Sequence, residues 1–161
     1  MTTLTVWKFE TPQGAQEALN KLIELSKQHL IQINDAATVA WAEGKKKPKT
    51  HNYGSLTGQG ALSGAFWGML FGLLFFVPFF GLAVGAAMGA LSGKFADYGI
   101  NDKFIQEVRA QVTEGTSALF LMTSGAVQDR VAEAFQGVSA QLIQSNLTSE
   151  QEAQLMEDFG G

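Results

Sequence analysis

The chain has 161 residues, of which 46% are hydrophobic and 16% are charged, and its formal net charge is −4. A net negative charge excludes a general attraction to nucleic acid. The absence of cysteine excludes disulfides, a thiol nucleophile and cysteine-ligated metal. The length suits one domain that carries an insertion.

The N-terminal flank alternates strand and helix signals. Residues 3–9, "TLTVWKF", are rich in β-branched and aromatic types and predict a strand. Thr11 as N-cap and Pro12 at the first helical position predict a helix that runs to about residue 28. A second strand is expected in 35–43, followed by a polar loop over 44–55. The first ten residues lack the basic and apolar regions of a secretory signal, so none is expected.

The C-terminal flank continues the alternation. Asn101 predicts the cap of a helix whose inner face is formed by Phe104, Ile105, Val108 and Val112. Residues 116–124, "TSALFLMTS", predict a central strand covered on both faces, because their middle is continuously apolar. A helix through Val127, Val131, Ala134 and Phe135 and a strand over 139–145 complete a predicted βαβ unit. Thr148 and Gln151 form a capping box for a last helix, through about Phe159, whose acidic residues predict a solvated face.

Helices packed on a sheet are the architecture that this alternation favours. We therefore expect an α+β fold: a ferredoxin-like α/β sandwich, or a variant of it, interrupted by an apolar insertion. The predicted segments are 1–55 and 97–161 for the two parts of the α/β domain, and 56–96 for the insertion.

The insertion is the most apolar part of the chain, and no residue between His51 and Lys94 is charged. Each half, 56–76 and 79–95, is just long enough for a membrane-spanning helix. Val77 and Pro78 divide the halves, and proline disfavours a helix at both positions. The segment therefore predicts a helical hairpin with a turn at Val77 and Pro78.

Two glycine ladders lie within this predicted hairpin. Glycine at every fourth position lines one face of a helix, which costs stability in water but allows close backbone packing in lipid. The ladders predict a helix-packing and oligomerisation surface formed by Gly60, Gly64, Gly68, Gly72, Gly81, Gly85, Gly89 and Gly93.

The tip of the predicted hairpin, "FFVPFF", carries no polar residue, which is unusual for a loop that emerges into water. Three arrangements stay open: a full span, insertion from one side, and hairpins that bury one another in an oligomer. Basic residues flank the hairpin and predict that both soluble flanks lie on the cytoplasmic side of a membrane. They either contact lipid head groups or belong to solvated loops: Lys45, Lys46, Lys47, Lys49 and Lys94.

No arrangement of residues indicates chemistry. His29 and His51 are the only histidines, and their separation matches no zinc site. The glycines lack the lysine–serine/threonine ending of a phosphate-binding loop. We therefore expect no catalytic residues, cofactor, metal, nucleic acid or small-molecule substrate. Trp7 and Trp41 are expected in the core, and Trp67 is expected to face lipid or a neighbouring helix.

The order of three motifs resembles a widespread bacterial family of uncharacterised, stress-associated predicted membrane proteins with a glycine-zipper hairpin. The motifs are the hairpin with the following "GINDKFIQEV", the strand "GTSALFLM" and the tail "SNLTSEQEAQL", and they cover most of the chain from about residue 50. The resemblance implies a membrane location and no established activity.

These observations lead to a primary functional prediction and three alternatives. The primary prediction is a non-enzymatic membrane-associated protein that assembles with itself, with itself and lipids as its partners. The alternatives are a channel or transport subunit, a soluble homo-oligomer that buries the hairpins at its centre, and an enzyme or small-ligand sensor seated in the α/β domain.

Overall fold

A computed structural model describes residues 2–28, 33–46, 48–54, 64–76, 93–137 and 140–159. The strands are β1 (Thr2–Phe9), β2 (Asp35–Ala40), β3 (Lys49–Gly54), β4 (Ser117–Ser124) and β5 (Ala140–Leu147). The α-helices are α1 (Gly14–Lys27), α2 (Gly64–Phe71), α4 (Asp102–Gln111), α5 (Gly125–Ala134) and α6 (Ser149–Phe159). A π-helix, η1 (Gly72–Phe76), continues α2, and residues 93–97 are also helical.

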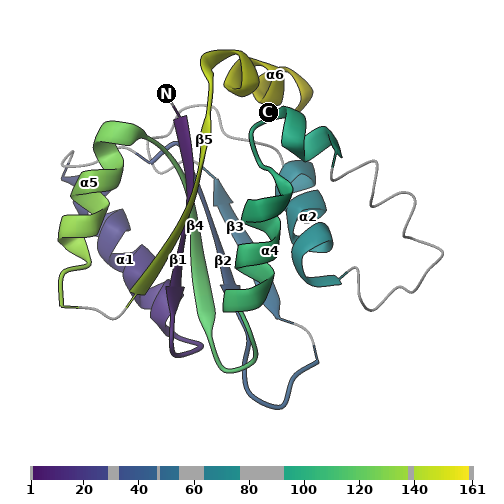
Figure 1. The fold of residues 1–161 in the computed structure, drawn as a ribbon. Coiled ribbons are helices and arrows are strands. Elements are labelled where there is room, and N and C mark those ends of the chain that lie inside the picture. The colour runs from purple at the N-terminus through teal and green to yellow at the C-terminus, as the bar shows by residue number, and fades with distance from the viewer. Residues whose placement is uncertain are drawn as a thin grey trace.

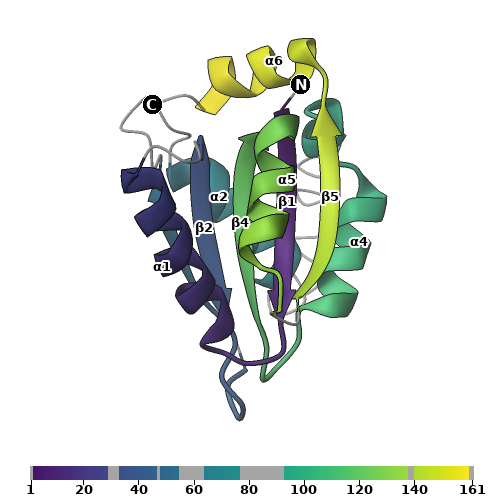
Figure 2. The same ribbon diagram turned by 90° about the vertical axis from the view of Figure 1, so that its left-hand side faces the viewer.

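The strands form one five-stranded sheet in the order β3-β2-β4-β1-β5. Every neighbouring pair is antiparallel, so β4 and β5, which α5 joins, run parallel on either side of β1. Helices cover both faces: α1 and α5 on one, α2 and α4 on the other (Figures 1 and 2). The described residues therefore form a mixed α+β fold with three layers.

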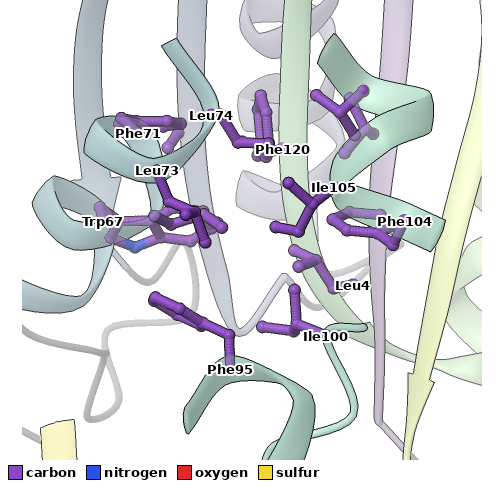
Figure 3. Packing of buried hydrophobic residues seen from close by; sticks show 14 of the residues in the cluster. Leu4, Trp67, Phe71, Leu73, Leu74, Phe95, Ile100, Phe104, Ile105 and Phe120 are labelled. Carbon is purple, nitrogen blue, oxygen red and sulfur yellow. The ribbon is translucent and has the colours of Figure 1, made fainter. Parts of the chain in front are cut away.

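Each face of the sheet has its own hydrophobic cluster, because side chains alternate between the two faces of a strand. Trp7, Phe9 and Leu119 lie under α1 and α5 and meet Phe135 there. Leu4 and Phe120 lie under α2, η1 and α4 on the other face, as Figure 3 shows. The central position predicted for the strand over 116–124 is confirmed, since β4 lies between β1 and β2 and its apolar residues are buried.

Two helix starts were predicted correctly from single residues. The Asn101 side chain accepts a hydrogen bond from the Phe104 N–H at 3.0 Å. The Gln151 N–H donates to Thr148 Oγ1 at 3.1 Å, and Gln151 Oε1 accepts from the Thr148 N–H at 2.9 Å. The predicted capping box of the last helix is therefore confirmed.

The predicted start of the first helix was wrong. Helix α1 begins at Gly14, and its N-cap is Gln13 rather than Thr11. The cap interaction comes from a distant residue: Ser117 Oγ on β4 accepts from the Ala15 N–H at 2.9 Å and donates to the Thr11 carbonyl at 2.7 Å. A partner 102 residues away in the chain leaves no local signal near Thr11.

The prediction of a loop over 44–55 was also wrong in part. Strand β3 occupies Lys49–Gly54 and pairs with β2, with a register shift at Ala36 and Ala37. Its residues are mostly polar because β3 lies at the edge of the sheet, where charged residues such as Lys49 and a bulge protect against further pairing.

The described residues contain no apolar helical hairpin. Of the predicted first arm, 56–76, only residues 64–76 are described, and they form α2 and η1. The predicted turn at Val77 and Pro78, and residues 79–92 of the second arm, lie outside the described residues. Among the helices that the structure describes, none combines the length and the apolarity needed to cross a membrane.

Candidate helix-packing surface

One side of the α2–η1 segment is packed against the sheet. Trp67 stacks on Phe71 with ring centroids 5.7 Å apart, and both rings meet Phe120 of β4 edge to face, at 6.2 and 5.2 Å. Trp67, predicted to face lipid or a neighbouring helix, is instead 1% exposed in this cluster (Figure 3). The segment buries Phe66, Trp67, Leu70, Phe71, Leu73, Leu74 and Phe75.

A buried carboxylate fixes Trp67 on the sheet. The Trp67 indole N–H donates to Asp35 Oδ1 at 3.1 Å, and the same oxygen accepts from the Ala36 N–H at 3.0 Å. Asp35, at the start of β2, is 1% exposed. The hydrogen bond fixes the orientation of the buried indole. It also provides a partner for a buried carboxylate, which would be costly to leave unpaired. The sequence alone did not single out Asp35 for this role.

The other side of α2 carries the glycines. Gly68 is exposed and Gly72 is partly exposed, and the neighbouring Met69 is 42% exposed. A Cβ atom built on Gly68 or Gly72 would meet no heavy atom of the described chain within 4 Å. Gly68 of α2 and Gly72 of η1, about one helical turn apart, therefore leave open space among the described residues on the side of this segment that faces away from the sheet.

The structure places only part of the two predicted ladders. Gly64 is the first residue of α2, and Gly93, exposed with open space around it, begins the helical residues 93–97. The remaining predicted members lie outside the described residues: Gly60, Gly81, Gly85 and Gly89.

Arg109 of α4 caps the end of the π-helix. Its Nη2 donates to the Leu73 carbonyl. In a π-helix a carbonyl accepts from the N–H five residues later, and for Leu73 that residue is Pro78, which has no N–H. A basic side chain that donates to one of the last carbonyls is common at the C-terminal end of a helix.

The predicted head-group lysines lie at two ends of the domain. Lys45, Lys46 and Lys49 are exposed around the β2–β3 connection, next to Ala40. Lys94 is exposed in the helical residues 93–97, close to the opposite end of the sheet, and Lys47 is outside the described residues. Figure 1 shows the two regions at opposite ends of the strands, so these lysines do not form one basic patch.

Two further hollows lie away from the glycines of the predicted ladders. A cavity of about 400 Å³ between α1 and α5 is lined by Phe9, Phe135 and Ala18 and has Glu10, Glu17 and Lys21 among its polar groups. A more polar hollow of about 380 Å³ lies between α4 and β5, at Lys103, Glu107 and Asn146. Within the described residues, no cluster of side chains is suited to hold a metal ion.

Helix α6 contacts the rest of the domain through the buried Leu155 and through a pair of side chains, Tyr98 and Asp158. Tyr98 donates its hydroxyl hydrogen bond to Asp158 Oδ2, and Gln154 donates to Asp158 Oδ1 at 3.1 Å. The bond from Tyr98 is the main cause that lowers the pKa of Asp158 below its ordinary value. Burial, followed by the bond to Asp158, raises the pKa of Tyr98. The contact therefore favours a charged carboxylate facing a protonated phenol.

This pair predicts a pH-dependent contribution to stability. A carboxylate whose folded pKa is lowered stabilises the fold above its unfolded pKa, about 3.9, and loses that contribution as the pH falls through the folded value. We therefore expect Tyr98→Phe to lower the melting temperature at pH 7 and to have a smaller effect below pH 4. The control is Thr3→Val, which removes a bond to the neutral Asn146 and should act equally at both pH values. A Tyr98→Phe effect that is independent of pH would contradict the assignment.

The comparisons with known proteins identify one family. A model described as a protein of unknown function (DUF1269) matches residues 61–160, which include α2, η1 and the C-terminal elements. Neither the curated proteins nor the solved structures contain a match to this chain.

Proposed function

The chain belongs to the DUF1269 family, and we propose that it is a non-enzymatic, membrane-associated protein that assembles with itself through glycine-lined helix faces. The observation that carries the proposal is the two-sided character of α2. The aromatic side of α2 and η1 is buried on the sheet, while a Cβ atom built on Gly68 or Gly72 would meet no heavy atom of the described chain within 4 Å.

An uncovered glycine face is suited to a second helix. Glycine in a helix costs about 0.5–1 kcal/mol relative to alanine when nothing packs against it. The absence of a side chain lets another backbone approach closely and gain van der Waals contacts, which is the basis of glycine-zipper packing. The partner in this proposal is the corresponding face of a second copy, because the same ladder pattern is then present on both sides.

The α/β domain would present these helices as a ferredoxin-like sandwich with one added edge strand. The order β5-β1-β4-β2 and the connections through α1 and α5 support this classification. In the proposal the membrane contact comes from the uncharged stretch that follows η1, on the cytoplasmic side of a bacterial inner membrane. The exposed Lys45, Lys46, Lys49 and Lys94 are the residues that would contact lipid head groups.

The test is the double substitution Gly68→Leu and Gly72→Leu, with Gly68→Ala and Gly72→Ala as its matched control. A Cβ atom at either position meets no heavy atom of the described chain, and leucine favours a helix, so the domain should stay folded. We expect leucine to reduce the assembly to single chains, because its side chain separates the backbones, and alanine to preserve it. Light scattering of purified protein measures the particle mass, and an unchanged mass in the leucine variant would defeat the proposal.

A second candidate is a soluble homo-oligomer, and the burial of the α2–η1 aromatic residues on the sheet favours it. Both candidates use the glycine face and differ in what surrounds the assembly. Purification without detergent, followed by lipid analysis, distinguishes them: a lipid-free oligomer supports the soluble form, and a requirement for detergent supports the membrane form.

A further inference from the structure

The hydrophobic cluster that contains Leu4 and Phe120 borders a small cavity beside the π-helix η1. The cavity has a volume of about 220 Å³. Trp41, Leu74, Phe75 and Val112 give it apolar walls, and Trp41 meets Phe75 edge to face with centroids 6.3 Å apart. Arg109, Thr113 and Glu114 provide its polar groups.

The guanidinium of Arg109 is incompletely satisfied in this cavity. Its Nη2 donates to the Leu73 carbonyl, but Nε is buried and has no hydrogen-bond partner within the described residues. Arginine cannot lose its proton at physiological pH, so a half-buried guanidinium normally pairs with an anion. The nearby carboxylate of Glu114 is occupied elsewhere, because its Oε1 accepts from the Gly44 N–H at 2.9 Å.

From this combination we infer that the cavity binds a small carboxylate with a short apolar tail. The carboxylate would pair with the guanidinium of Arg109 at the cavity wall, and the tail would lie against Trp41, Phe75 and Val112. At about 30 Å³ for each small group, the volume accommodates roughly seven non-hydrogen atoms. The nearby Glu114 disfavours a ligand with two negative charges, so a single carboxylate is preferred over a phosphate monoester.

Such a ligand would join two elements that meet at this cavity. Leu74 and Phe75 belong to η1, whereas Arg109 and Val112 come from α4 and its C-terminal cap. Since the ligand binds the folded arrangement, it would stabilise η1 on the sheet by mass action. The inference does not depend on self-assembly, because none of the residues that line the cavity is a ladder glycine.

Pentanoate, which has seven non-hydrogen atoms, is the probe. We expect it to shift the Trp41 indole N–H resonance and to raise the melting temperature of the full-length chain at millimolar concentrations. Pentylamine tests the need for the negative charge and acetate tests the need for the tail, and neither should match pentanoate. The Trp41 resonance is identified by its loss in Trp41→Phe.

The matched variants are Arg109→Gln and Lys103→Gln, which remove the same charge from α4 inside and outside the cavity. Arg109→Gln should weaken pentanoate binding about tenfold or more, as expected for the loss of a hydrogen bond to a charged group, and Lys103→Gln should leave it unchanged. Equal binding of pentanoate and pentylamine to the unmodified chain, or no binding of pentanoate, would overturn the inference without any variant. Equal weakening by both substitutions would also overturn it.

Discussion

Trp67→Ala is expected to lower the free energy of unfolding by about 3–5 kcal/mol, the usual range for the loss of a large buried aromatic side chain. Trp67 fills the space between α2 and Phe120, and its indole N–H is a donor to the buried Asp35. The substitution therefore leaves a cavity and removes a hydrogen bond from a buried carboxylate. Urea denaturation in detergent-free buffer measures the change.

The control for this substitution is Met69→Ala on the same helix. Met69 is 42% exposed, so its loss should change the free energy of unfolding by no more than about 0.5 kcal/mol. The pair distinguishes a helix packed on the sheet from one that sits in lipid. If α2 were embedded in lipid, neither substitution would alter the stability of the α/β domain in water, and equal small effects would contradict the packing described here.

Ser117→Ala is the second substitution with a large expected effect, about 1–3 kcal/mol. Ser117 is fully buried, and its hydroxyl joins β4 to the start of α1 through the Thr11 carbonyl and the Ala15 N–H. Alanine leaves both backbone groups without this partner. Thermal unfolding measures the loss, and Ser149→Ala, at an exposed position in α6, is the control with little expected effect.

An outcome in which Ser117→Ala and Ser149→Ala destabilise equally would show that the hydroxyl does not act as the cap of α1. Water cannot easily replace it, because Ser117 has no exposed surface. The result would also test the corrected helix start directly, since Thr11 was the cap that the sequence predicted.

Local signals were sufficient for most of the α/β domain. Residue composition and the spacing of apolar residues located β1, α1, β4 and β5, and short-range capping identified Asn101 and Thr148. Distant partners account for the errors. Ser117 caps a helix that begins more than 100 residues earlier, and β3 is defined by pairing with β2 rather than by its own composition.

The apolar segment shows a second reason why the structure could not be predicted fully from the sequence. An uncharged run of aromatic and aliphatic residues fits a lipid bilayer and the face of a sheet equally well, so composition cannot choose between them. The sequence does not show that Leu4 and Phe120 form an apolar face of the sheet. Trp67 and Phe71 pack against that face. Arg109 was overlooked for the same reason: its role depends on the carbonyl of Leu73, which no spacing rule connects to it.

The placement of η1 sets a limit on how far the chain can reach into a bilayer. Residues 77–92, sixteen in number, join Phe76 to Gly93. Chain segments cross lipid as helices, and a helix of that length extends about 24 Å, less than one crossing of a hydrocarbon core of about 30 Å. Crossing and returning therefore requires residues 64–76 to leave the sheet. Full insertion would consequently expose Leu4 and Phe120 to water, so the packed and the fully inserted arrangements exclude each other in one molecule.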